Sequence, residues 1–160
     1  MKKSCYILAL VLLGSGAHAS ETNYMSMSLK ADTLFEVKTA KDRSNLYLTA
    51  EGTAKFESSK NRVYAYARCA AVDTIVEGHH SVYAGVGDCH FTSPSGGVLY
   101  GTFKTPEGRG DRGFMVLSNG TGDLAGFSGS EIPLIARVNP RMTGKPVFHF
   151  DNTEKKNINE

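Results

Sequence analysis

Arg62–Ala70 reads RVYAYARCA, and this stretch decides the fold class. Small or apolar side chains occupy every second position, and tyrosine or arginine occupies most of the positions between them. A period of two residues is typical of a β-strand with one face in the core and the other towards solvent. We therefore expect a half-buried strand here, although alternation alone leaves open which face is the inner one.

The hairpin that follows predicts a disulfide. Ser81–Phe91 reads as a second strand, and Glu77–His80 separates it from the first. An antiparallel hairpin centred on His79 places Cys69 directly opposite Cys89, within disulfide reach. We expect a Cys69–Cys89 bridge, with a free or metal-binding thiol pair as the competing interpretation. The CxxC spacing of redox enzymes is absent, which argues against an oxidoreductase.

Strand patterns recur along the rest of the chain, with turn-forming residues between them, whereas helical periodicity is hard to find. The meander predicted by this spacing is all-β and antiparallel. An open sheet would leave two edges to protect, so we favour a single closed β-barrel of about eight strands over a sandwich. Besides the hairpin above, strands are expected at Tyr24–Leu29, Leu34–Thr39, Asn45–Phe56, Val98–Lys104, Gly113–Ser118, Ile132–Val138 and Pro146–Phe150.

The two ends of the chain differ from its middle. Residues 1–19 are expected to be a cleaved signal peptide of bacterial type, because two lysines precede the apolar run Cys5–Leu13 and a small-residue cleavage site. That run is too short to span a membrane. Export to the periplasm or the cell exterior would supply the oxidising environment for a disulfide. Residues 20–150 are expected to form the barrel domain, and residues 151–160 a disordered polar tail.

The charge balance argues against nucleic acid as a partner. The chain has 18 Lys and Arg against 16 Asp and Glu, and Lys2 and Lys3 of the leader account for the excess. A mature chain with zero net charge has no global basic field. We expect no nucleic-acid partner and no membrane span, while a small apolar ligand, a protein partner and a homo-oligomer remain open.

Asn119–Glu131, NGTGDLAGFSGSE, is dense in glycine. Glycines this close together are costly inside a helix and suit a tight turn followed by a strand that bends. We expect a structural turn here, formed by Gly120, Gly122, Gly126 and Gly129.

The same segment resembles a signature of secreted bacterial relatives of the allene oxide cyclase and dirigent β-barrels. Gly87–Phe103, GDCHFTSPSGGVLYGTF, is similar to a hairpin of that family, although the acidic residues usual in its turn are missing here. The resemblance covers roughly Tyr64 to Val138. It implies a β-barrel and a function in steering a reactive apolar intermediate. The family's catalytic and acidic pocket residues match no identifiable position in this chain, so none is carried over.

The leading functional hypothesis is non-enzymatic binding of a small apolar molecule inside the barrel. The competing interpretation is that the aromatic residues only fill the core or cover its outside. The candidate lining residues are Tyr64, Tyr66, Tyr83, Tyr100, Phe103 and Phe114.

Two alternatives remain. A cofactor-independent cyclase or isomerase would need a cavity with one buried carboxylate or tyrosine. A protein-binding module, such as an enzyme inhibitor, would act through loops around Glu77–His80 or Pro106–Arg112. No cofactor and no metal are expected, since His79, His80 and His90 do not form a convergent ligand set. The catalytic residues are unknown, but a general acid or base could come from Glu51, Glu57, Asp123 or Glu131.

Overall fold

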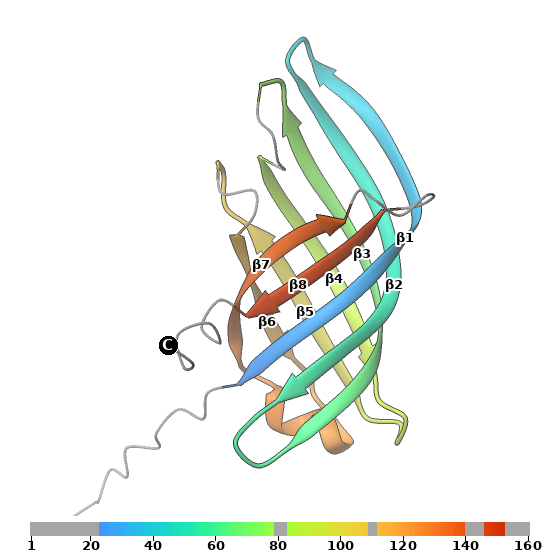
Figure 1. The fold of residues 1–160 in the computed structure, drawn as a ribbon, viewed down its shortest axis with the longest axis vertical. Coiled ribbons are helices and arrows are strands. Elements are labelled where there is room, and N and C mark those ends of the chain that lie inside the picture. The colour runs from blue at the N-terminus through green and yellow to red at the C-terminus, as the bar shows by residue number, and fades with distance from the viewer. Residues whose placement is uncertain (1–22, 79–82, 109–111, 140–145, 153–160) are drawn as a thin grey trace, which may run out of the picture.

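The computed structural model describes residues 23–78, 83–108, 112–139 and 146–152. Eight antiparallel strands in meander order form a closed barrel, as the sequence predicts (Figure 1). The strands are β1 (Tyr24–Ala40), β2 (Arg43–Glu57), β3 (Arg62–Val76), β4 (Ala84–Thr92), β5 (Val98–Thr105), β6 (Arg112–Ser118), β7 (Glu131–Asn139) and β8 (Val147–Asn152).

The first strand is longer than expected. Tyr24–Leu29 and Leu34–Thr39 belong to one continuous strand, β1, which has a register shift against β2 between Ala31 and Thr33. A bulge of this kind moves the residues beyond it to the opposite face of the sheet. The alternation is interrupted there, which is why the sequence reads as two strands. Beyond Ala31, the β1–β2 hairpin rises above the neighbouring β8 (Figure 1).

The boundary of the expected tail also moves. Strand β8 ends at Asn152, so Asp151 and Asn152 belong to the barrel and pair with β1 or β7. The predicted signal peptide and the rest of the tail lie outside the described residues.

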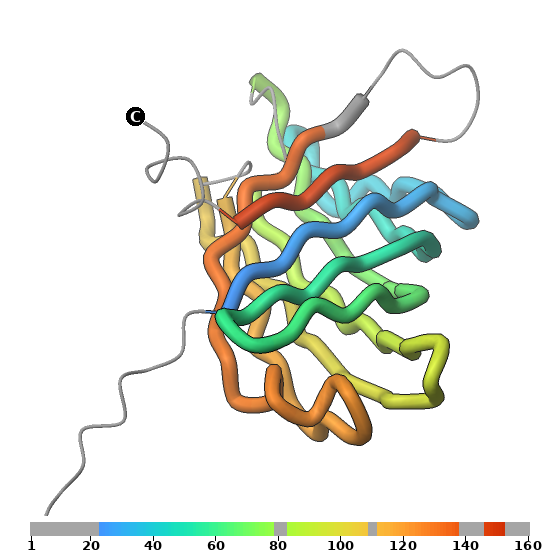
Figure 2. The backbone as a smooth tube through the Cα atoms, turned by 60° about the horizontal axis from the view of Figure 1, so that its bottom comes forward, coloured from blue at the N-terminus to red at the C-terminus, as the bar shows by residue number. Residues whose placement is uncertain are grey.

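The glycine-rich segment is a plug rather than the expected simple turn. Gly122–Phe127 forms a 3-10 helix, η1, that covers the lower end of the barrel (Figures 1 and 2). Leu124 and Phe127 of η1 are fully buried and point into the barrel end. Gly122 and Gly129 have φ of 56° and 85°, a backbone region that favours glycine, so these two enter and leave the plug. Tight loops and apolar anchors explain the glycine density better than a bending strand.

Hydrogen bonds fasten the plug to the turn between β4 and β5. The buried Ser93 hydroxyl donates to the Asp123 carboxylate at 2.7 Å and accepts the Gly97 N–H at 3.0 Å. The Val98 N–H donates to the Thr121 hydroxyl at 3.0 Å. The Ser93 hydrogen bond is the main cause of a lowered pKa for Asp123. The lower end is therefore closed by both packing and polar contacts.

Aromatic residues fill the lower half of the barrel above η1. Phe56 meets Phe91 edge-on, with ring centroids 5.0 Å apart, and lies 5.4 Å from Phe127. All three rings are fully buried. Because protein interiors pack as densely as organic crystals, this cluster fills the lower part of the barrel with side chains.

Candidate functional site

A small cavity lies above the aromatic cluster, and its wall is almost entirely apolar. Its volume is about 50 Å³. A single water position needs roughly 10–15 Å³, so the space holds a few waters or the end of a slender molecule. The lining residues are Met27, Leu29, Leu48, Ala50, Cys69, Ala70, Ala71, Asp73, Gly87, Cys89, Phe103, Phe148 and Phe150.

The cavity exists because residue sizes differ around the barrel. Small residues from β2, β3 and β4, such as Ala50, Ala71 and Gly87, form one side of it. A Cβ atom on Gly87 would lie 2.7 Å from the Ala71 Cβ, so only glycine allows these strands this close approach. Phe103 and Phe150 face them from β5 and β8, with ring centroids 5.4 Å apart. The space is left between the small residues and these rings.

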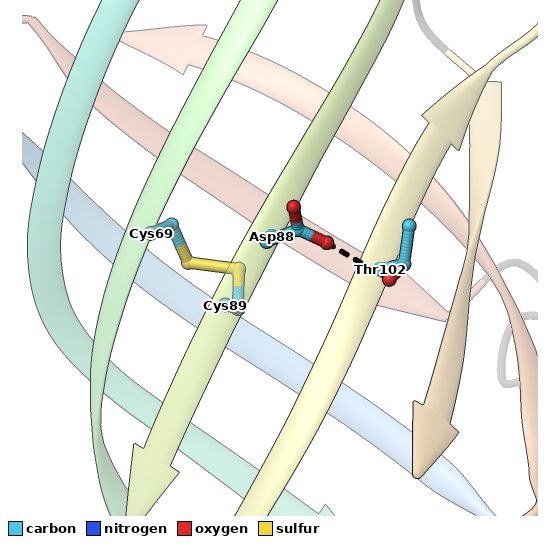
Figure 3. Close-up of a disulfide and its surroundings, with 4 residues drawn as sticks. All are labelled: Cys69, Asp88, Cys89 and Thr102. Atoms are coloured by element: carbon cyan, nitrogen blue, oxygen red, sulfur yellow. Dashed lines mark hydrogen bonds between the residues drawn. A yellow bond between two sulfur atoms is a disulfide. The ribbon is translucent and has the colours of Figure 1, made fainter.

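The disulfide forms part of the cavity wall. Cys69 and Cys89 are direct register partners on β3 and β4, as the hairpin centre predicts, and their Cα atoms are 4.1 Å apart (Figure 3). Figure 3 also shows Asp88, the residue before Cys89, accepting a hydrogen bond from Thr102 of β5 at 2.9 Å. Both sulfur-bearing residues line the cavity, whereas Asp88 is exposed on the outer face.

Among the described residues that line the cavity, Asp73 is the one ionisable residue apart from the disulfide-bonded cysteines. Its exposed fraction is 8%, and desolvation by burial raises its pKa from 3.8 to about 6. A buried carboxylate costs free energy in the charged form, so the proton is held more tightly than in water. In the part of the chain that the structure describes, no hydrogen bond or ion pair satisfies this carboxyl group.

Sequence reasoning missed Asp73, although a signal was present. One face of the strand is formed by every second residue, 63, 65, 67 and 69. The same alternation continues through Ala71 to Asp73. Once Cys69 is known to face inwards, strand geometry requires Asp73 to face inwards too. In the segment Cys69–Val76, CAAVDTIV, Asp73 is a carboxylate at an inward-facing position among mostly apolar residues, and this pattern identifies it as a candidate site residue.

The predicted ligand-lining aromatic residues are mostly outside the barrel. Phe103 lines the cavity, but Tyr64, Tyr66 and Tyr100 lie on the outer face with exposed fractions of 59%, 45% and 47%. Alanines and Cys69 occupy most of the inner positions of β3, since a narrow barrel has no room there for a row of tyrosines. These three tyrosines therefore do not line the interior.

The other two candidates also lie away from the cavity. Phe114 is half-buried and registers with Lys104 on the outer side of the barrel. Tyr83 precedes β4, and the Arg43 guanidinium lies 5.8 Å from its ring centroid.

The acidic candidates do not converge on a site. Glu57 pairs with Arg62 and Lys55, and Asp123 belongs to the plug contacts. Glu51 and Glu131 are exposed on the outer face.

The histidine candidates give no metal site in the described part of the chain. The His90 ring stacks on Tyr100 with centroids 5.0 Å apart, and His79 and His80 lie outside the described residues. The described residues contain no group of three His, Cys, Asp or Glu side chains able to hold a metal ion. The loops around Glu77–His80 and Pro106–Arg112 are described only in part.

No protein family matches the sequence, and no curated protein is similar to it. The fold is similar to a crystal structure of a protein with unknown function from Clostridium acetobutylicum ATCC 824, at 8% identity and a TM-score of 0.45. The match covers 82% of this chain and 96% of that one. Among the described residues, no helix has the length and apolar character needed to cross a membrane.

Proposed function

We propose that this protein binds a small molecule by inserting its apolar end into the barrel cavity. The observation that carries the proposal is an apolar space bounded by a closed lower end and by residues from β1 to β5 and β8. Burial of apolar surface contributes about 25 cal/mol per Å², so even a short hydrocarbon chain gains affinity there. The small volume restricts the buried part to a few non-hydrogen atoms.

The predicted leader supports a role outside the cytoplasm. A cystine is stable in an oxidising compartment, and the bridge between Cys69 and Cys89 fits such a location. We therefore propose an exported binding protein that meets its ligand in the periplasm or outside the cell.

A matched pair of variants tests the binding site. Ala70 and Ala71 both contribute to the cavity wall, but neighbouring strand residues point their side chains to opposite faces, so the side chain of Ala71 faces the cavity and that of Ala70 is exposed on the outer face. Butan-1-ol is the probe, and methyl NMR shifts of Met27, Leu29 and Leu48 report on the cavity wall. We expect shifts in the wild type and in Ala70→Leu and none in Ala71→Leu, whose larger side chain fills the space.

The proposal fails if butanol moves only signals from the outer face, or if Ala71→Leu responds as the wild type does. A urea unfolding curve for each variant checks that it is folded. This control matters because added volume in a core also destabilises.

Asp73 favours a second candidate function. A cyclase or isomerase that steers a reactive apolar substrate needs a protonatable group in a dry cavity, and a carboxyl with a pKa of about 6 can give or take a proton near neutrality. This function agrees with the resemblance to allene oxide cyclase and dirigent barrels. Its test is the stereochemistry of products from a short unsaturated epoxide. An enantiomeric excess lost in Asp73→Asn would support it, and a racemic product with the wild type would exclude that substrate class.

A further inference from the structure

We propose that the cavity selects a small organic cation, in which an ammonium group is attached to a short apolar chain and lies against Asp73. The inference rests on the proposed function, because it names the class of molecule that the same cavity holds. Three features carry it: the position of Asp73 along the cavity, the absence of a partner among the described residues, and the composition of the wall.

Asp73 and the disulfide mark two levels of the cavity. The side chains of every second residue of β3 face inwards. Among them, Cys69, Ala71 and Asp73 follow one another from the closed end towards the upper end of the barrel. Asp73 is the last of the three, so a molecule entering from above meets the carboxyl group first. Its apolar part would continue down to the level of the cystine. This order suits a molecule with a polar head and a short apolar tail.

No described residue neutralises the Asp73 carboxylate. Its register partners are Leu46 on β2 and Gly85 on β4, and Gly85 pairs in turn with Thr105 on β5. None of these side chains carries a charge, and the cavity residues from β1 and β8 are apolar as well.

The nearest charges in register are on the overhanging part of β1. Glu36 pairs with Leu46 of β2, which in turn pairs with Asp73, and Lys38 lies two residues further along β1. Both are exposed, and neither lines the cavity. A strand spacing of about 4.8 Å places Glu36 two strands, or roughly 10 Å, away from Asp73. Among the described residues no side chain supplies a counter-charge to Asp73, and we assign that role to the ligand.

The charge state of Asp73 distinguishes between ligand classes. With a pKa of about 6, the carboxyl is mostly ionised at pH 7 despite its burial. An anion in an apolar wall repels another anion and gains little from a neutral alcohol, whereas a cation removes the cost of the unpaired charge. Phe148 and Phe150 line the same cavity, and their ring faces also attract cations.

Three probes with similar chains test this selection: butylammonium, butan-1-ol and butanoate. Isothermal titration at pH 7 should give at least tenfold tighter binding of butylammonium than of butanol, and no binding of butanoate. Between pH 7 and pH 5 the ionised fraction of a group with a pKa of about 6 falls about tenfold. Butylammonium affinity should fall by the same factor, while butanol affinity should not.

Variants assign the effect to the carboxylate. Asp73→Asn should reduce butylammonium affinity to the level of butanol and abolish its pH dependence. Asp88→Asn removes a carboxylate of the outer face on the neighbouring strand and should change neither. The selection of cations is refuted if butanol binds in the cavity and butylammonium binds no tighter, a result that leaves the binding function standing. If neither probe binds, both proposals are wrong.

Discussion

Replacing Asp73 with asparagine should remove a pH dependence from the stability of this protein. The folded state raises the pKa of Asp73 from 3.8 to about 6, because burial penalises the charged form. Between these two values the folded state holds a proton that the unfolded state has released. Stability therefore falls as the pH rises through this window, and the loss is complete above pH 6.

The magnitude follows from the size of the shift. Each pKa unit corresponds to about 1.4 kcal/mol of difference between the two protonation states. The rise from 3.8 to about 6 thus predicts a loss of about 3 kcal/mol between pH 3.5 and pH 7.5. Asparagine has nearly the same shape and does not titrate, so the variant should lack this contribution at every pH.

Urea unfolding followed by circular dichroism measures the effect. The quantity to compare is the change in unfolding free energy between pH 3.5 and pH 7.5, in the wild type and in Asp73→Asn. Comparing the wild type with Asp73→Asn cancels the contribution of the other carboxyl groups to the pH dependence. The control variant Asp88→Asn should show the same pH dependence as the wild type. If the wild type and Asp73→Asn change equally, within about 0.5 kcal/mol, Asp73 is not desolvated and the reasoning is refuted.

Three further changes test the disulfide and the closed end. Cys69 and Cys89 close a loop with a sequence separation of 20, so replacing both by alanine should lower unfolding free energy by about 3 kcal/mol, and reductant should then have no further effect. Phe127→Ala should cost about 3–5 kcal/mol in urea unfolding, while Tyr64→Ala on the exposed outer face should cost much less; equal losses would contradict the plug. Ser93→Ala leaves the Gly97 N–H without its hydroxyl acceptor and should cost about 1–3 kcal/mol, an interpretation that an unchanged unfolding midpoint would overturn.

Local geometry made the β3–β4 hairpin predictable from sequence. A turn centre at His79 fixes the entire register, and Cys69 opposite Cys89 is its direct consequence. Alternation also located most strands, because one face of each is buried. The continuity of β1 was not predictable in the same way, since the bulge after Ala31 reverses the faces and interrupts the pattern.

The site was less predictable because it depends on which face turns inwards. Alternation in RVYAYARCA is equally compatible with tyrosines inside or outside, and only closure into a narrow barrel decides that the small residues face inwards. Phe103 was identified, but Asp73 was not, because an aspartate in a strand is ordinarily a solvent-exposed residue. The glycine-rich segment was likewise assigned to a turn, since the apolar anchors Leu124 and Phe127 show their role only when a barrel end is present to receive them.

The plug at the lower end also has a kinetic consequence. In the part of the barrel that the structure describes, the lower end is covered by η1 and filled by side chains, so a guest that enters from the upper end leaves by the same path. A guest then passes Asp73 both when it enters and when it leaves, and a second molecule cannot displace it from the lower side. The residence time of a guest is therefore set at the upper rim, whereas the buried Phe56–Phe91 pair above η1 sets how deep the guest can go.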